Sequence, residues 1–127
     1  MDGIAFVISG PAGVGKTTLC DRLIINYPDF LSRVVTVTTR KPRVGEIEGR
    51  DYHFVTKDKF NDLIQNQEFI EFAKIHNNFY GSSLKSVQEL FNKGRDVLLN
   101  IDVQGATSLR NIQGKYVFLK KKIQSVF

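Results

Sequence analysis

A glycine-rich octapeptide near the start of this chain restricts its fold more than any other segment. Residues 10–17 read Gly-Pro-Ala-Gly-Val-Gly-Lys-Thr and match the pattern G-x-x-x-x-G-K-[ST]. The six residues before them, Ile4 to Ser9, predict a buried strand, and the residues from Lys16 onward predict a helix. Strand, glycine-rich loop and helix in this order are typical of a phosphate-binding loop in an α/β domain.

The residue types in this loop suit a nucleoside triphosphate. Glycine at positions 10, 13 and 15 lets several backbone N–H groups approach phosphate oxygens closely. Lys16 supplies a cation for the β and γ phosphates, and the hydroxyl of Thr17 is placed to ligate Mg²⁺. The residues expected to bind the triphosphate are Gly10, Pro11, Ala12, Gly13, Val14, Gly15, Lys16, Thr17 and Thr18.

The helix expected over residues 16–27 points the positive end of its dipole at the same anion. Its apolar residues Leu19, Cys20, Leu23 and Ile24 fall at helical spacing and predict one buried stripe. Cys20 is therefore interpreted as a packing residue rather than as a redox group.

Length and composition are those of a single intracellular domain. A chain of 127 residues with 42% hydrophobic residues can bury a core of its own. Its one cysteine excludes an internal disulfide framework, and no apolar run approaches the roughly 20 residues of a membrane span. The N-terminus lacks the basic region of a signal peptide, so we expect a cytoplasmic protein. The net charge of +5 favours an anionic partner without choosing between nucleotide and nucleic acid.

Apolar runs of strand type alternate with helical patterns along the rest of the chain. The run from Val97 to Ile101 is nearly continuous, as in a central parallel strand that is covered on both faces. Thr56 is the expected cap of the helix that follows it. The other expected elements are strands at 34–38, 52–55, 68–75 and 123–127, helices at 57–67 and 83–92, and a turn at Asn77–Asn78. The pattern at 113–122 does not choose between strand and helix.

A second informative region follows the first helix. Arg40 and Arg43 lie three residues apart on a proline-containing loop, and two arginine forks can clamp one phosphate from two sides. Tyr52 and Tyr80 could add hydroxyl donors, and Glu71 could accept from ring N–H groups of a bound base. Taken alone, these residues are more typical of a solvated basic loop with tyrosines in the core.

Several blocks taken together resemble the guanylate kinase family. They occur in family order over nearly the whole chain, which makes the resemblance far more specific than the glycine-rich loop alone. The blocks are Gly10 to Lys16, Thr-Thr-Arg-Lys-Pro-Arg at 38–43, Gly-Arg-Asp-Tyr-His-Phe at 49–54, Glu-Phe-Ile-Glu at 68–71, Tyr-Gly-Ser at 80–82 and Asp-Val-Gln-Gly at 102–105.

The resemblance implies a kinase that transfers the γ-phosphoryl group of ATP to GMP with Mg²⁺, and it implies no nucleic-acid or membrane partner. Lys16, Arg40, Arg43 and Asp102 would be the catalytic residues, with Thr17 and Asp102 supporting the metal. A carboxylate at Glu71 would select guanine, which alone among the common bases presents adjacent N1–H and N2–H₂ donors. The residues implied to bind GMP are Thr36, Arg40, Arg43, Tyr52, Glu71, Tyr80, Gly81, Ser82 and Asp102.

The fold implied is a three-layer α/β/α P-loop NTPase domain with a parallel central sheet. A smaller lobe that binds the nucleoside monophosphate is expected at about residues 36–84. The core is expected at about residues 1–35 and 85–127.

The chain departs from the family pattern at a few positions and at its end. Ala12 stands where serine is common, Thr17 stands where glycine or serine is usual, and Asn100 stands where many members have an acid. The sequence ends at Phe127, before the arginine-bearing lid and the last core elements that the family carries. We therefore expect a truncated guanylate kinase that binds GMP more readily than it turns over.

Two other functional classes remain as alternatives. A guanylate-kinase-like protein-binding module without catalysis would use the GMP cleft for phosphorylated peptides. Such modules usually have a damaged loop, whereas residues 10–17 are intact here. A nucleic-acid binder would exploit the positive charge, but the basic residues are scattered and the aromatic residues lie at core spacing.

Overall fold

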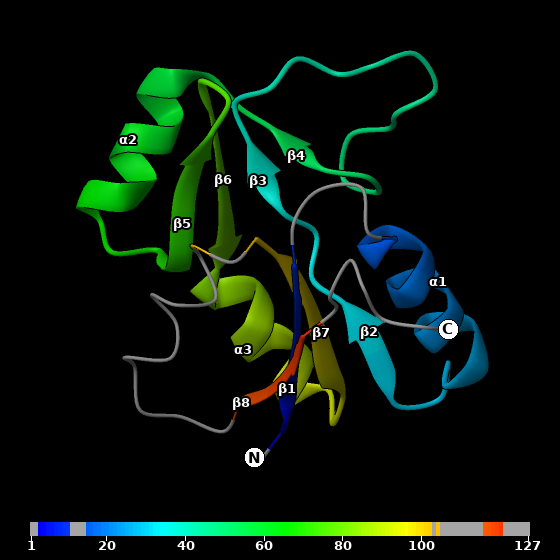
Figure 1. The fold of residues 1–127 in the computed structure, drawn as a ribbon. Helices are drawn as coiled ribbons and strands as arrows, with labels where there is room; N and C mark the ends of the chain where they lie inside the picture. The colour runs from blue at the N-terminus through cyan, green and yellow to red at the C-terminus, as the bar shows by residue number, and fades with distance from the viewer. Residues whose placement is uncertain (1–2, 11–14, 103, 105–115, 121–127) are drawn as a thin grey trace. The chain divides into compact units, whose positions relative to one another are not determined.

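The computed structural model describes residues 3–10, 15–102, 104 and 116–120 (Figure 1). Its contacts divide the chain into two units. Unit 1 comprises Met1–Val34 and Val87–Phe127, and unit 2 comprises Val35–Ser86. Among the described residues, no helix is both long enough and apolar enough to cross a membrane.

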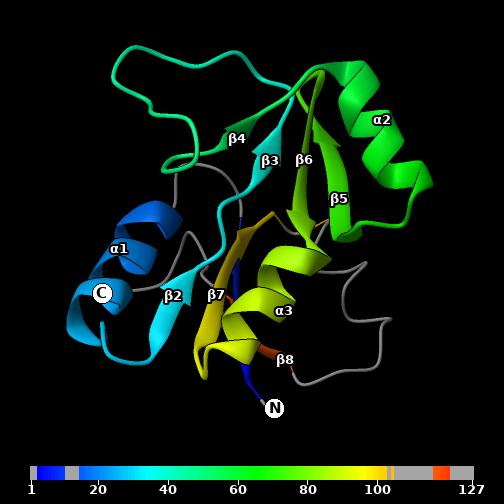
Figure 2. The same cartoon turned by 180° about the vertical axis from the view of Figure 1, so that it is seen from behind.

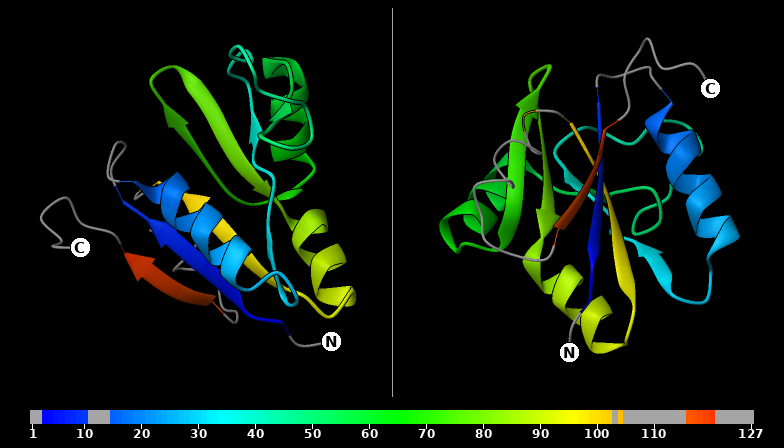
Figure 3. Two further views of the ribbon diagram at one scale, coloured as in Figure 1. Left: turned by 90° about the vertical axis from the view of Figure 1, so that its right-hand side faces the viewer. Right: turned by 60° about the horizontal axis from the view of Figure 1, so that its bottom comes forward.

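Unit 1 is built on a sheet whose described strands all run parallel. The strands are β1 (Ala5–Ser9), β2 (Leu31–Arg33), β7 (Asp96–Ile101) and β8 (Tyr116–Lys120), in the order β2-β7-β1-β8. Figure 3 shows β8, β1 and β7 side by side in its right-hand view. Parallel strands need long crossover connections, and helices in those connections cover the faces of the sheet.

Helices lie on both faces of this sheet. Helix α1 (Lys16–Asn26) packs the buried Cys20 against Ile8 of β1 and Leu98 of β7. The other residues of its expected stripe, Leu19, Leu23 and Ile24, pack against the same cluster and are partly buried. Side chains alternate along a strand, so Gly3 belongs to the face opposite Ile8. There the Phe91 ring of helix α3 (Leu84–Asn92) lies so close that it leaves no room for a Cβ on Gly3. The expected three-layer arrangement around a parallel sheet is therefore confirmed.

Unit 2 contains a second, mostly antiparallel sheet and one helix (Figure 2). The elements are β3 (Val37–Thr38), β4 (His53–Phe54), α2 (Lys57–Gln65), β5 (Phe69–Ile75) and β6 (Asn78–Ser83). The sheet order is β4-β3-β6-β5. Helix α2 begins after Thr56, whose hydroxyl accepts a hydrogen bond from the backbone N–H of Lys59, so the expected cap is confirmed.

The two faces of this second sheet differ in chemistry. Phe60 of α2 is fully buried and contacts the rings of Phe69, Phe72 and Phe79, at centroid distances of 4.6, 6.5 and 5.4 Å. This aromatic cluster forms the core of unit 2. The strand register puts a different set of side chains on the other face, namely Thr38, Glu71, Ala73, Tyr80 and Ser82.

The expected strand at 34–38 is wrong, because two short strands of different sheets replace it. β2 ends at Arg33 in unit 1, and β3 begins at Val37 in unit 2. The chain changes sheet between them, which an apolar run cannot reveal.

The hairpin that follows also differs in detail from expectation. Its turn lies at His76 and Asn77, both with positive φ, and Asn78 already belongs to β6. Strand β6 was not expected, because its glycine and serines are poor strand formers. A bulge between Phe69 and Glu71 turns Phe69 toward Phe72 instead of leaving it on the face of Glu71.

At the C-terminal end, residues 116–120 form a strand, whereas the strand expected at 123–127 lies outside the described residues.

Candidate active site

The start of helix α1 in unit 1 is built to receive an anion. Gly15 caps the helix with φ 85° and offers no side-chain acceptor to the first turn. The first turn also contains no acidic residue. The positive end of the helix dipole therefore keeps its backbone donors, which suits a phosphate. Of the other loop residues named above, Pro11, Ala12, Gly13 and Val14 lie outside the described residues.

Lys16 lies at the carboxyl edge of the parallel sheet. Its ammonium group donates to the backbone oxygen of Ile101 at 3.3 Å. Burial lowers the pKa of Lys16, and the charge of Asp102 opposes this shift. Because Ser9 pairs with Ile101, Gly10 and Asp102 follow neighbouring strands at the same edge, where α/β folds bind ligands.

Thr17 and Thr18 are exposed on the first turn of α1, beside Lys16. The structure thus brings together, within unit 1, the described residues expected to hold the triphosphate and the metal.

The ligand-type residues of unit 2 share one sheet face. Glu71 lies directly across from Ser82 in the β5–β6 pairing, and both side chains are buried. The Ser82 hydroxyl makes no hydrogen bond to the described residues. A buried hydroxyl without a partner is destabilising, so this position is suited to a ligand that supplies one.

Two tyrosines extend this face. Tyr80 pairs with Thr38 and is two residues from Ser82, and its ring centroid is 6.2 Å from that of Tyr52. Thr36 precedes Thr38 by two residues, so strand alternation assigns it to the same face.

Arg40 is anchored beside Tyr52. Its guanidinium carbon lies 5.0 Å from the centroid of the Tyr52 ring, a cation–π contact. The buried Thr38 hydroxyl accepts from the Arg40 backbone N–H at 3.1 Å and donates to the Phe79 carbonyl at 2.9 Å. The Arg40 backbone is therefore linked through Thr38 to β6, and the Arg40 side chain is held separately by Tyr52.

The Arg40 guanidinium also forms a two-point ion pair with Glu46. Nη1–Oε1 and Nη2–Oε2 are each 2.9 Å, and Nη1 donates further to the Lys41 carbonyl at 3.1 Å. The hydrogen bond from Arg40 lowers the pKa of Glu46 to about 2, and the same contact raises the pKa of Arg40.

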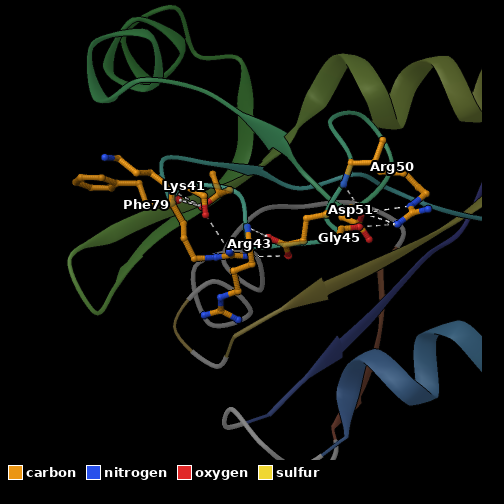
Figure 4. A network of polar contacts seen from close by, with 10 residues as sticks. Lys41, Arg43, Gly45, Arg50, Asp51 and Phe79 are labelled. Atoms are coloured by element: carbon orange, nitrogen blue, oxygen red, sulfur yellow. Dashed lines mark hydrogen bonds and ion pairs between the residues drawn. The ribbon is translucent and has the colours of Figure 1, made fainter.

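Arg43 is held differently from Arg40. Its backbone N–H donates to Glu46 Oε1 at 2.7 Å, whereas its exposed guanidinium makes no hydrogen bond or ion pair with the described residues. In Figure 4 the Arg43 side chain extends away from the dashed contacts of the loop. An exposed, unpaired guanidinium on a fixed backbone is available to an incoming anion.

Gly81 lies between Tyr80 and Ser82 in β6, but its side-chain position faces the other side of the sheet. It lies on the face that α2 covers, where a Cβ would be 2.7 Å from the Phe69 ring. Packing against Phe69 therefore explains why a residue without a side chain stands at this position. Asp102, also expected to bind GMP, belongs to unit 1.

Three carboxylates that organise this loop were missed by the sequence analysis. Glu46, Glu48 and Asp51 accept backbone N–H groups of Arg43, Phe54 and Ile47, each at 2.7 Å. Their signal was the presence of three acids within a segment that is otherwise basic. No periodicity marks such contacts, because they depend on the loop conformation.

Comparisons with known proteins agree with one another. A family model described as guanylate kinase matches residues 3–126. The chain is 51% identical over 119 residues to guanylate kinase from Nitratidesulfovibrio vulgaris and 42% identical over 119 residues to that from Clostridioides difficile. The crystal structure of guanylate kinase from Anaplasma phagocytophilum aligns over 93% of this chain, with a TM-score of 0.76 and 36% identity.

These relatives are longer than the chain. The matches cover 92% of the chain, but 57% and 58% of the two relatives, and 58% of the aligned crystal structure's chain.

Proposed function

This chain belongs to the guanylate kinase family, and on that premise we propose that it serves the transfer of the γ-phosphoryl group of ATP to GMP, giving ADP and GDP. The observation that carries the proposal is the buried pair of Glu71 and Ser82 on one sheet face. A carboxylate there can accept from N1–H and N2–H₂ of guanine, and the Ser82 hydroxyl gains a partner. Adenine has no such pair of donors.

Arg40, Arg43, Tyr52 and Tyr80 are proposed to hold the GMP phosphate. The two guanidinium groups neutralise charge on the acceptor, and this lets a second polyanion approach in line. Tyrosine hydroxyls add donors at the sheet face that Arg40 overlies. Catalysis then rests on positioning and electrostatics, without a covalent intermediate.

The triphosphate is proposed to bind at the start of α1, where Lys16 exchanges the Ile101 carbonyl for phosphate oxygens. The donor set there fits Mg²⁺, because Thr17 and Asp102 offer the oxygen ligands that this ion prefers, completed by water and phosphate. When bound, the ion neutralises charge on the phosphate oxygens. We further propose that the reaction takes place in the cytoplasm with these two nucleotides as partners, without nucleic acid or a membrane.

Titration calorimetry of the 127-residue chain with GMP and AMP tests the base-recognition step. We expect GMP to bind and AMP to bind at least about a hundredfold more weakly. Glu71→Gln should remove most of this discrimination, because its amide N–H₂ faces the guanine donors. Glu68→Gln, on the exposed neighbouring acid, is the matched control and should bind as the wild type. Equal affinity for GMP and AMP in the wild type would contradict the proposal.

The transfer step is tested with ATP labelled at its γ-phosphate, in an experiment with protein in excess over GMP. Labelled GDP is the expected product, and the same experiment with Lys16→Ala should yield none. If the wild type forms no labelled GDP although both nucleotides bind, the proposed transfer is wrong for this chain.

A further inference from the structure

One carboxylate connects the two arginines that we propose hold the GMP phosphate. Oε1 of Glu46 accepts from Arg40 Nη1 at 2.9 Å and from the Arg43 backbone N–H at 2.7 Å. Its own backbone N–H donates back to the Arg43 carbonyl at 3.0 Å, which closes a tight turn. The turn contains Gly45 with φ 87°, a conformation that glycine adopts readily. Glu46 therefore determines the direction of the Arg40 guanidinium, and it fixes the backbone position from which the Arg43 side chain extends.

Several contacts fix the direction of the Arg40 guanidinium. Glu46 accepts from Nη1 and Nη2, and the Lys41 carbonyl accepts a further Nη1 proton. Tyr52 adds a side-chain hydrogen bond to the same guanidinium, which lies over its ring. A guanidinium held in one direction by a carboxylate can present its other N–H groups to phosphate oxygens.

We propose that Glu46 is a positioning residue for the acceptor phosphate. It holds the guanidinium of Arg40 over Tyr52, and it fixes the backbone from which Arg43 reaches the same phosphate. This inference rests on the proposed function, since it takes GMP as the ligand of that face.

Simple electrostatics makes the opposite prediction for this residue. A carboxylate close to a bound phosphate repels it, so removal of its charge should strengthen GMP binding. Positioning outweighs this repulsion because Glu46 is already neutralised by a two-point ion pair, in which only 11% of the Arg40 side chain and 20% of the Glu46 side chain are exposed. A fixed arginine also loses less conformational freedom on binding than a mobile one. The sign of the effect therefore distinguishes positioning from charge.

Titration calorimetry with GMP and with guanosine, which lacks the phosphate, provides the test. For Glu46→Gln we expect the Kd of GMP to rise at least about tenfold and that of guanosine to stay within about twofold of wild type. Glu48→Gln is the matched control, because Glu48 accepts a backbone N–H in the same loop but contacts Phe54 and His53 instead of the arginines. Both Kd values of Glu48→Gln should stay within about twofold of wild type.

A double variant separates positioning from a general effect on folding. In the Arg40→Ala background, Glu46→Gln should weaken GMP binding by clearly less than in the wild type, because part of its action passes through Arg40. Unchanged or tighter GMP binding by Glu46→Gln would overturn the inference. Equal losses for GMP and guanosine, together with a lowered melting temperature, would also overturn it in favour of a structural role.

The failure of this inference is distinguishable from that of the proposed function. A wild-type chain that does not bind GMP overturns both. A wild-type chain that prefers GMP to AMP, combined with a Glu46→Gln variant that binds GMP as the wild type does, overturns only the role of Glu46.

Discussion

The ammonium group of Lys16, at the first position of α1, donates to the backbone oxygen of Ile101, at the end of β7, over 3.3 Å. The two residues are 85 positions apart in the chain. Their contact holds a partly desolvated cation at the carboxyl edge of the sheet, beside Asp102. Burial there disfavours the charged form of the lysine.

Replacement of this lysine should separate stability from binding. We expect Lys16→Met to raise the melting temperature of the nucleotide-free chain, because burial disfavours the charged form. The same variant should lose binding of a fluorescent ATP analogue by at least about a hundredfold, as expected for a lysine on the β and γ phosphates. Thermal unfolding and fluorescence titration measure the two effects. Lys85→Met, at an exposed lysine of α3, is the control and should change neither the melting temperature nor the affinity for the analogue. A Lys16→Met variant that still binds the analogue tightly would argue against the proposed triphosphate site.

The aromatic core of unit 2 should depend on Phe60. This side chain is fully buried among three other phenylalanines, so Phe60→Ala leaves a cavity and should lower the free energy of unfolding by about 3–5 kcal/mol. Urea denaturation followed by circular dichroism measures the loss. Phe72→Ala removes the same atoms from a side chain that is 42% exposed and should have a clearly smaller effect. Equal losses for both variants would contradict the assignment of the core.

Gly81 should resist substitution because of packing. In Gly81→Ala the new methyl group would be 2.7 Å from the Phe69 ring, which we expect to lower the free energy of unfolding by about 1–3 kcal/mol. The double variant Gly81→Ala/Phe69→Leu should recover part of this loss, because a smaller side chain makes room. Chemical denaturation of the single and double variants tests the expectation. A double variant that loses the sum of the two single effects would show that the contact is not the cause.

The stabilising effect of the carboxylates in the loop at residues 40–54 should depend on pH in the acid range. The pKa of Glu46 falls from its ordinary 4.5 to about 2 in the folded chain, and those of Glu48 and Asp51 are also lowered, chiefly by hydrogen bonds. Groups with a lowered folded pKa stabilise the fold above their unfolded pKa, and this contribution disappears as pH falls through the folded pKa. The melting temperature of wild type should therefore exceed that of Glu46→Gln by a constant amount above pH 4.5. The difference should shrink between pH 4.5 and about 2. A difference that grows on acidification would contradict the ion pair.

Local patterns were sufficient for most elements of the fold. The glycine-rich loop, the apolar stripe containing Cys20 and the continuous run at 97–101 predicted the strand, helix and central strand that unit 1 contains. Thr56 was recognisable as a cap because it bonds within its own helix turn. The change of sheet between Arg33 and Val37 was not recognisable, because it depends on which distant strands each residue meets.

Some residues of the candidate site could be named from the sequence, and others could not. Arg40, Glu71 and Tyr80 were named from residue type and family resemblance, and their roles toward GMP remain predictions. The part played by Glu46 could not be named, because it arises from a contact over six positions across an irregular loop. The bulge at Phe69 was equally hidden, since alternation alone assigns that ring to the face of Glu71.

Alternate residues of strand β6 serve the two faces of its sheet differently. Tyr80 and Ser82 face one way, whereas Phe79 and Gly81 face Phe60 and its aromatic neighbours. A shift of one residue in the pairing of this strand with β5 would exchange the two sets at once. The polar groups would then be turned into the hydrocarbon core, and a phenylalanine would replace them on the polar face.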